Sequence, residues 1–205
     1  MARIISIDYA EAVPHAQDVI ERGELLVLPT DTVYGIGTAL DADAIARIFA
    51  AKQRPPERAV PVLLADQDAA MVVATAFPDA ARQLAAAFWP GPLTIVLPKR
   101  DDLPANLTTL PTVGVRVPDQ DMARAVIAAC GGALPVTSAN LSDAPAACTI
   151  QDAIEYFNDD VALYLDGGPC PGGVPSTVIA FDDDGELRVL REGPISAAEL
   201  LAVLV

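Results

Sequence analysis

The chain has 205 residues, of which 52 % are apolar, so it has ample material for a hydrophobic core. Thirteen Lys and Arg against 28 Asp and Glu give a formal net charge of −15 with the single histidine neutral. So acidic a surface repels phosphate groups, which argues against strong direct binding to nucleic acid or to an anionic membrane. A small basic pocket is still compatible with this charge.

The counts of histidine and cysteine exclude several kinds of site. The only histidine, His15, lies in an N-terminal helical pattern far from any candidate nucleophile, which disfavours a Ser-His-Asp triad. Cys130, Cys148 and Cys170 are spread without a C-x-x-C pair, so no zinc site is expected. An odd number of cysteines fits a reducing compartment, and the N-terminal residues lack a signal-peptide pattern. We therefore expect a cytoplasmic protein.

Hydrophobic periodicity predicts one domain, residues 1–205, in which strands alternate with helices. In chain order, the expected elements are strand Arg3–Ile7, helix Glu11–Arg22, strand Leu25–Pro29, a helix through Ile45 and Phe49 up to Lys52, strand Val60–Leu64, helix Ala69–Ala74, helix Asp79–Phe88, strand Leu93–Leu97, strand Val113–Val117, helix Asp121–Ala129, strand Leu134–Thr137, helix Ile150–Phe157, strand Thr177–Phe181, strand Glu186–Leu190 and helix Ser196–Leu204. The turn at 182–185 predicts a hairpin between the last two strands. This pattern indicates an α/β fold with a mixed sheet.

A polar loop, Thr30–Gly35, follows the second strand. Ligands of open α/β sheets bind beyond the carboxyl ends of strands, where short hydroxyls and the Asp31 carboxylate can hold a small polar ligand with an amine. The alternative is a turn in which Asp31 bonds its own backbone. The loop alone does not distinguish the two.

Three cations, Lys52, Arg54 and Arg58, follow one another at the end of the second predicted helix. They can complement the negative end of the helix dipole without further function. Alternatively they form a clamp on a polyphosphate, with arginine offering bidentate contacts and lysine a point charge.

Arg116 stands in the middle of the predicted strand Val113–Val117, on the face opposite the valines, together with Gly114. An arginine in mid-strand must reach solvent or pair with an anion. That anion is either a structural aspartate or the carboxylate of a ligand.

Polar residues also end the later strands. Ser138 and Asn140 would stand at the same sheet edge as Thr32, either as caps or as ligand contacts. Gly172 and Gly173 allow backbone amides to approach an anion, and Arg191 adds a cation at the end of the last strand.

Taken in order, these motifs resemble the YrdC-like family of L-threonylcarbamoyladenylate synthases over nearly the whole chain, from about Ile20 to Ile195. The matching segments are P-T-D-T-V-Y-G at Pro29–Gly35, K-x-R at Lys52 and Arg54, W-P-G-P-L-T at Trp89–Thr94, V-G-V-R-V-P at Val113–Pro118, S-x-N at Ser138 and Asn140, S-T-V at Ser176–Val178, and R-x-G at Arg191 and Gly193. Each motif alone is common, whereas seven in this order are specific.

The resemblance implies a twisted, open sheet of parallel and antiparallel strands with flanking helices and a concave pocket. It implies a nucleotidyltransferase that joins L-threonine, bicarbonate and ATP into threonylcarbamoyl-AMP and releases pyrophosphate. Mg²⁺ would arrive with ATP, without a tightly bound metal on the protein. A downstream transferase complex acting on tRNA would use the product. Some members carry a further C-terminal domain; this chain ends at Val205 and resembles the short form.

The resemblance also implies roles for individual residues. Lys52 and Arg54 would act in catalysis on the phosphates. ATP would be bound by Lys52, Arg54, Arg58, Thr112, Ser138, Asn140 and Arg191. Threonine would be bound by Thr32, Arg116 and Ser176, with Arg116 on its carboxylate. Some members have a histidine where this chain has Leu63.

Two expectations about the cations follow. Lys52, Arg54, Arg116 and Arg191 should converge on one cavity, where they would attract anionic substrates. Lys52 should be solvent-accessible, since it ends a helix.

Two alternative functions stay open: a paralogue of the same fold that uses another carbamoyl or nucleotide substrate, and an RNA-binding module, against which the net charge argues.

Overall fold

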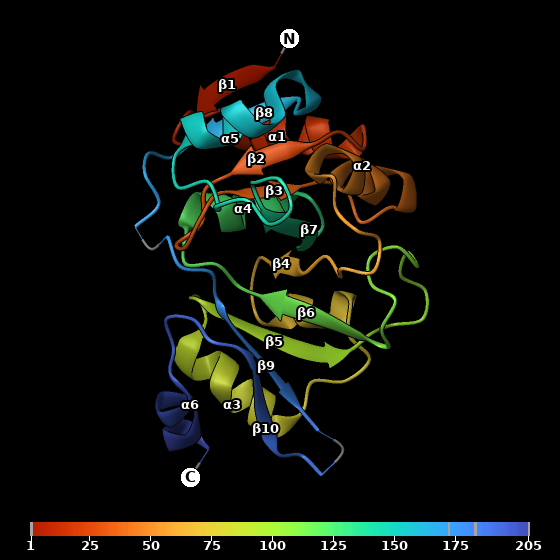
Figure 1. Cartoon of the computed structure of the whole chain (residues 1–205), viewed down its shortest axis with the longest axis vertical. Helices are drawn as coiled ribbons and strands as arrows, with labels where there is room; N and C mark the ends of the chain where they lie inside the picture. Colours follow the sequence, from red (N-terminus) through yellow and green to blue (C-terminus); the bar gives the residue numbers. More distant parts are fainter. Residues whose placement is uncertain (1, 172, 183, 205) are drawn as a thin grey trace.

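One open sheet runs through the computed structural model, which describes residues 2–171, 173–182 and 184–204 (Figure 1). Its ten strands are β1 (Arg3–Ser6), β2 (Leu26–Leu28), β3 (Gly35–Gly37), β4 (Val62–Leu64), β5 (Leu93–Pro98), β6 (Thr112–Arg116), β7 (Ala133–Ser138), β8 (Leu163–Asp166), β9 (Thr177–Phe181) and β10 (Leu187–Arg191). The helices are α1 (Ala12–Glu21), α2 (Ala42–Lys52), α3 (Asp79–Phe88), α4 (Asp121–Ala129), α5 (Ile150–Phe157) and α6 (Ala197–Val203), with short 3₁₀ turns at Asp68–Val72 and Asn158–Asp160.

The sheet is mixed, as the sequence predicts. Its strand order is β1-β8-β2-β3-β7-β4-β6-β5-β9-β10. The pairs β1–β8, β2–β8, β4–β6 and β5–β9 are parallel, and the remaining neighbours are antiparallel. The predicted hairpin joins β9 to β10, with a register shift near Arg191; Asp183 in its turn lies outside the described residues.

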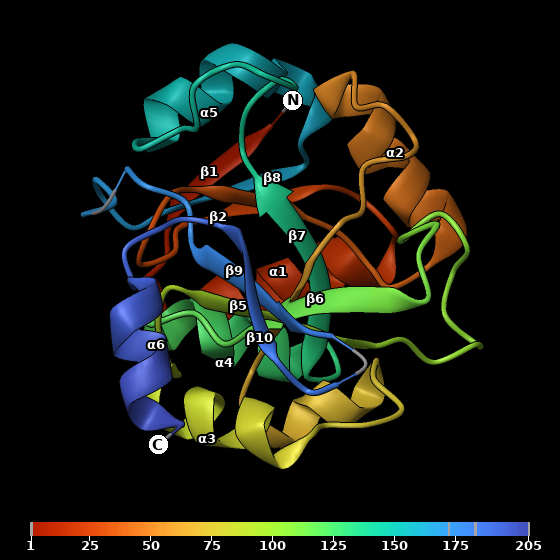
Figure 2. The ribbon, with the colours of Figure 1, turned by 60° about the horizontal axis from the view of Figure 1, so that its bottom comes forward.

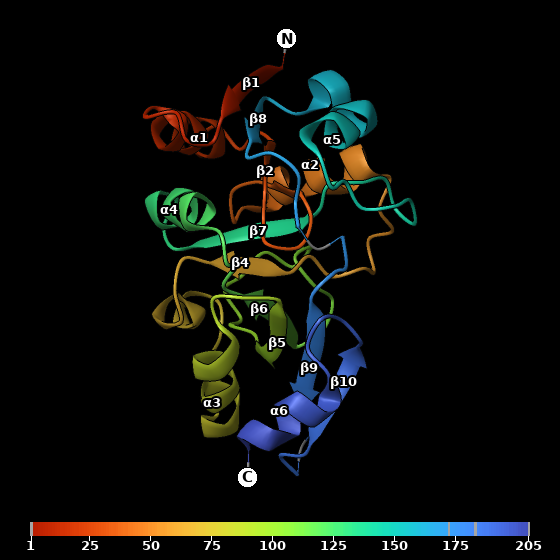
Figure 3. The same ribbon diagram turned by 90° about the vertical axis from the view of Figure 1, so that its left-hand side faces the viewer.

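Helices cover both faces of the sheet around β2. Figure 3 shows α1 and α4 on one side of β2, and α2 and α5 on the other. Leu26 and Leu28 of β2 pack with apolar residues of α1 and α4, whereas Val27 packs with those of α2. Because successive strand residues point to opposite faces, a strand buried on both sides reads as a continuous apolar run. At the other end of the sheet α6 packs beside α3 (Figure 2).

The sequence predicts most elements correctly and misses two strands. The bounds of α3, α4, α5 and β9 are those expected. The segment Ala69–Ala74 is a 3₁₀ turn over Asp68–Val72 rather than an α-helix. No strand is predicted for β3, which begins at the last residue of the loop motif, Gly35, or for the four-residue β8. Both strands are held by pairing with distant segments. Among the described residues, no helix is long and apolar enough to cross a bilayer.

Candidate active site

A cavity of about 350 Å³ opens on the face of the sheet opposite α3. Strand residues that alternate with core positions form its floor, and the loops before β3, after α2 and before β9 form its walls. The lining residues are Thr30, Thr32, Val33, Tyr34, Gly35, Arg54, Ala59, Pro61, Leu63, Thr94, Val96, Gly114, Arg116, Val136, Thr137, Ser138, Pro175, Ser176, Val178 and Arg191.

The alternation predicted for β6 creates the floor of the cavity. Val113 and Val115 are buried in the core, so Gly114 and Arg116 face the cavity. A Cβ atom at Gly114 would lie 3.2 Å from Thr94 Cγ2 on the neighbouring strand. Glycine at this position therefore keeps the floor open.

Arg116 is 6 % exposed and is held by three segments. Its Nε donates to the Gly91 carbonyl at 2.9 Å, one Nη donates to Thr32 Oγ1 at 2.9 Å, and the other Nη bonds Asp31 Oδ1. Of the two anions expected as partners of Arg116, the structural aspartate is therefore present, and it is Asp31. A guanidinium has five N–H groups, of which these contacts use three, so two can still bind a ligand carboxylate. Burial lowers the pKa of Arg116, while Asp31 raises it.

Arg191 and Ser176 form a second polar wall. Arg191 Nε and Nη2 donate to the Ser176 carbonyl at 3.1 and 2.8 Å, and Nη2 also lies 3.2 Å from Ser176 Oγ. The Ser176 hydroxyl is 2.8 Å from Thr94 Oγ1. Burial lowers the pKa of Arg191. These contacts fix one side of the guanidinium against the backbone and leave an oriented cation at the cavity.

Arg54 enters the cavity from the end of α2. Asp41 caps this helix by accepting from two backbone N–H groups, and Gln53 ends it in a left-handed conformation with φ 49°. Arg54 then donates to the carbonyls of Arg58 and Ala59, at 3.2 and 2.7 Å. The half-buried guanidinium is thus oriented by backbone alone. Burial lowers its pKa, and the neighbouring Arg58 charge adds to that effect.

Lys52 contradicts the expectation that it is solvent-accessible, because it is 1 % exposed and does not line the cavity. Its Nζ donates to the Ser138 carbonyl at 2.5 Å, to the Asn140 carbonyl, and to Asn140 Oδ1 at 3.3 Å. The last turn of α2 points inward here, so its final residue reaches the segment after β7. Lys52 therefore joins α2 to the segment that carries Ser138.

Burial is the main cause that lowers the pKa of Lys52 to about 7, and the Arg54 charge acts in the same direction. The three oxygen acceptors favour the charged form and act in the opposite direction. The pKa of Lys52 therefore depends on the position of the segment that carries Ser138 and Asn140.

The other expected ATP contacts lie in different positions. Ser138 lines the cavity, and its hydroxyl donates to Asn140 Oδ1 at 2.5 Å, while the buried Asn140 lies behind it. Arg58 is exposed and pairs with Asp143 at 2.8 Å. Thr112 begins β6, at the opposite end from Arg116, and is outside the lining. The structure thus brings Thr32, Arg54, Arg116, Ser138, Ser176 and Arg191 together around one cavity, and leaves Lys52, Arg58, Thr112 and Asn140 outside its lining.

Sequence reasoning missed part of the site. Thr94 and Thr137 line the cavity, and Gly91 contributes through its carbonyl to Arg116. Thr94 shares with Arg116 the strand-face alternation, because Leu93 and Ile95 on either side of it are buried in the core, and this was the available signal. Of the glycine loop, Gly173 N donates to the Thr32 carbonyl at 3.0 Å; Gly172 lies outside the described residues.

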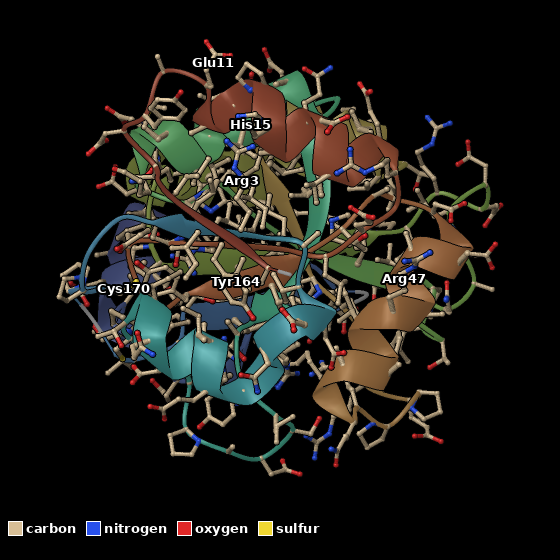
Figure 4. All side chains as sticks on the ribbon, turned by 90° about the horizontal axis from the view of Figure 1, so that it is seen from above. Arg3, Glu11, His15, Arg47, Tyr164 and Cys170 are labelled. Atoms are coloured by element: carbon tan, nitrogen blue, oxygen red, sulfur yellow. The ribbon has the colours of Figure 1, made fainter. Side chains whose placement is uncertain are left out.

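His15 is not among the residues that line the cavity. Figure 4 shows it on α1, beside Arg3 of β1. The Nδ1 atom of His15 is 3.2 Å from an Nη of Arg3. Over residues 2–171, 173–182 and 184–204, no three His, Cys, Asp or Glu side chains are grouped to hold a metal ion.

Comparison with known proteins now decides the family. The family model Sua5_yciO_yrdC, described as "Telomere recombination", matches residues 18–193. The chain belongs to the Sua5/YciO/YrdC family. It is 37 % identical to the threonylcarbamoyl-AMP synthase of Pyrococcus abyssi over 191 residues, which cover 92 % of this chain and 56 % of that protein.

Solved structures agree with the family assignment. The structure of P. abyssi Sua5 complexed with L-threonine matches with a TM-score of 0.93 at 35 % identity, covering 100 % of this chain and 61 % of that one. E. coli YciO matches with a TM-score of 0.87 at 25 % identity, covering 98 % of this chain and 100 % of that one. The chain spans about half the length of the first curated relatives it matches, 56 % in each case.

Proposed function

We propose that this member of the Sua5/YciO/YrdC family is an L-threonylcarbamoyladenylate synthase, which makes threonylcarbamoyl-AMP and pyrophosphate from L-threonine, bicarbonate and ATP. The similar P. abyssi protein is named threonylcarbamoyl-AMP synthase, and the matching structure of P. abyssi Sua5 is described as complexed with L-threonine. We further propose that the product is passed to a transferase that modifies tRNA, and that the reaction takes place in the cytoplasm.

The observation that carries the proposal is the convergence of three guanidinium groups on one cavity. Arg54, Arg116 and Arg191 come from the end of α2, β6 and β10, and all three line it. The chain as a whole has a formal net charge of −15. A positive cavity in so acidic a protein focuses anionic ligands inward. ATP, bicarbonate and the threonine carboxylate are all anions.

The proposed chemistry suits such a site. The carbamate of threonine, once formed, is itself a nucleophile, so its attack on the α-phosphate needs no histidine base. Charge then develops on the α-phosphate and on the departing pyrophosphate. Positioned guanidinium groups, with the Mg²⁺ that arrives with ATP, stabilise that charge.

We assign the residues of the cavity to different substrates. Arg116 and Thr32, with Ser176, would hold threonine, because Arg116 keeps two N–H groups in a fixed orientation for a carboxylate. Arg54, Ser138 and Arg191 would hold ATP at the cavity. Lys52, Asn140, Arg58 and Thr112 would act on ATP only through the segments that they join or end.

A paralogue of the same fold is the second candidate, favoured by one observation. E. coli YciO, a family member of the same fold, matches with a TM-score of 0.87 at 25 % identity. Such a paralogue would use another carbamoyl or nucleotide substrate. The substrate requirement for pyrophosphate release distinguishes the two.

The test is pyrophosphate release by the purified chain from ATP and Mg²⁺, with threonine and bicarbonate omitted in turn. We expect release only when both are present, and a loss of roughly 100-fold or more in Arg54→Ala. Release that does not depend on threonine would favour the paralogue. No release with all substrates present would contradict the proposal.

A further inference from the structure

The segment 191–195 leaves β10, passes the start of β9 and leads into α6 (Figure 2). Its first residue, Arg191, donates to the Ser176 carbonyl at 3.1 and 2.8 Å. Two residues further on, a Cβ atom at Gly193 would lie 2.3 to 2.7 Å from backbone atoms of residues 175–177, so only glycine allows this approach. The segment therefore lies directly against the backbone at the start of β9.

The hydroxyl of Thr177 holds the end of this segment through a reciprocal pair of hydrogen bonds. Thr177 Oγ1 donates to the Ile195 carbonyl at 2.8 Å and accepts from the Ile195 N–H at 3.0 Å. Because a hydroxyl has one proton and two lone pairs, both bonds form at once. Thr177 is 0 % exposed and Ile195 is 6 % exposed, and neither lines the cavity. The hydroxyl therefore holds the backbone and does not face a ligand.

Regular strand pairing does not fix the position of Arg191. Val189 of β10 pairs with Ile179 and Arg191 pairs with Val178, so the register shifts between them. An irregularity of this kind interrupts the ladder and redirects the side chain. The direction of the Arg191 guanidinium therefore depends on how the chain that follows it is held.

We propose that Thr177 is a positioning residue, which fixes the segment 191–195 at Ile195 and so directs the Arg191 guanidinium toward the phosphates of ATP. The inference rests on the proposed function, in which Arg191 binds ATP, and extends it to a buried residue outside the cavity lining. Arg191 bonds the carbonyl of Ser176, and Ile195 bonds the next residue along, Thr177. The two attachments thus share one short piece of backbone, and loosening one loosens the other.

The test is calorimetric titration of the full chain with ATP and Mg²⁺ and, separately, with L-threonine. Thr177→Val keeps the shape of the side chain and removes the hydroxyl. We expect the affinity for ATP to fall about tenfold, which corresponds to one hydrogen bond to a charged group. The affinity for threonine should stay within about threefold, because Arg116 and Thr32 are held by other segments. Thr177→Ser restores the hydroxyl and should restore ATP binding.

A double-mutant cycle distinguishes positioning of Arg191 from a general loss of structure. In Arg191→Ala the guanidinium is absent, so adding Thr177→Val should change ATP affinity by less than about threefold. Thr38→Val is the matched control, because its buried hydroxyl also donates to a backbone carbonyl, that of Glu24 at 2.9 Å, and lies outside the cavity lining. It should bind ATP as the wild-type protein does.

A second variant applies if Thr177→Val fails to fold. Pro194 is an exposed residue of the same segment, and Pro194→Gly loosens the segment between its two attachments without changing the core. It should weaken ATP binding by about threefold or more, and should have no such effect in the Arg191→Ala background.

Three results would overturn the inference while the proposed function stands. They are unchanged ATP affinity in Thr177→Val, or in Pro194→Gly where that variant is needed; a loss that persists in full when Arg191 is already alanine; and an equal loss of ATP and threonine. A wild-type protein that does not bind ATP would overturn the proposed function, and this inference with it.

Discussion

Lys52 should make the stability of this protein depend on pH. Burial, with the charge of Arg54, lowers the pKa of Lys52 from 10.5 to about 7. Between these values the unfolded chain holds the proton more tightly than the folded one. The free energy of unfolding therefore rises with pH over this range, and the contribution is lost as the pH falls toward 7.

The size of the effect follows from the shift. Between pH 7 and pH 9 the contribution of Lys52 to the free energy of unfolding grows by about 2 kcal/mol. Burial raises the pKa values of the Cys130 and Cys170 thiols to about 11. Those groups lower stability as the pH rises above about 9, the ordinary pKa of the thiol, so the measurement is confined to pH 7–9.

The assay is urea unfolding at pH 7 and pH 9 of the wild-type protein, Lys52→Met and Lys99→Met. Lys99 is the only other lysine and is half-buried against one carbonyl, that of Thr108. We expect Lys52→Met to lack about 2 kcal/mol of the rise that the other two proteins show. If the free energy of unfolding rises equally from pH 7 to pH 9 in all three proteins, Lys52 is not a buried group that titrates in this range.

Three further outcomes are expected. Arg116→Ala should weaken threonine binding by roughly 30- to 1000-fold in calorimetry and leave ATP binding nearly unchanged; unchanged threonine affinity would exclude its proposed role. Gly193→Ala should destabilise the protein by about 2 kcal/mol or more in urea unfolding, since its Cβ would lie 2.3 Å from the Thr177 nitrogen, and a variant of wild-type stability would be inconsistent with that approach. Arg54→Ala should lower the rate of pyrophosphate release, whereas Lys99→Ala should stay within about threefold of wild type; equal rates in the two variants would argue against a phosphate contact at Arg54.

Elements with a strong local pattern could be predicted from the sequence, and elements formed by long-range pairing could not. The helices α3, α4 and α5 have amphipathic periodicity and were located to the residue. By contrast, β3 contains two glycines and is a strand because β7, about 100 residues away in the chain, pairs with it on the side opposite its neighbour β2. The short β8 pairs with β1, about 160 residues away in the chain. Neither pairing has a local signal.

The same distinction applies to the site. Strand alternation predicted that Arg116 faces away from the core, and this is confirmed. The pattern could not show that Asp31 pairs with it, because that contact spans 85 positions. For Lys52 the helix end was predicted but its environment was not, since the acceptors that surround it are supplied by residues 138 and 140.

The central claim is that this cavity joins threonine, bicarbonate and ATP. The most direct measurement incubates the purified chain with ¹³C-labelled bicarbonate, L-threonine, ATP and Mg²⁺ and identifies the nucleotide product by mass spectrometry. The account predicts a threonylcarbamoyl adenylate that carries the label, formed together with pyrophosphate. A nucleotide product without the label, or one formed equally well without threonine, would contradict it.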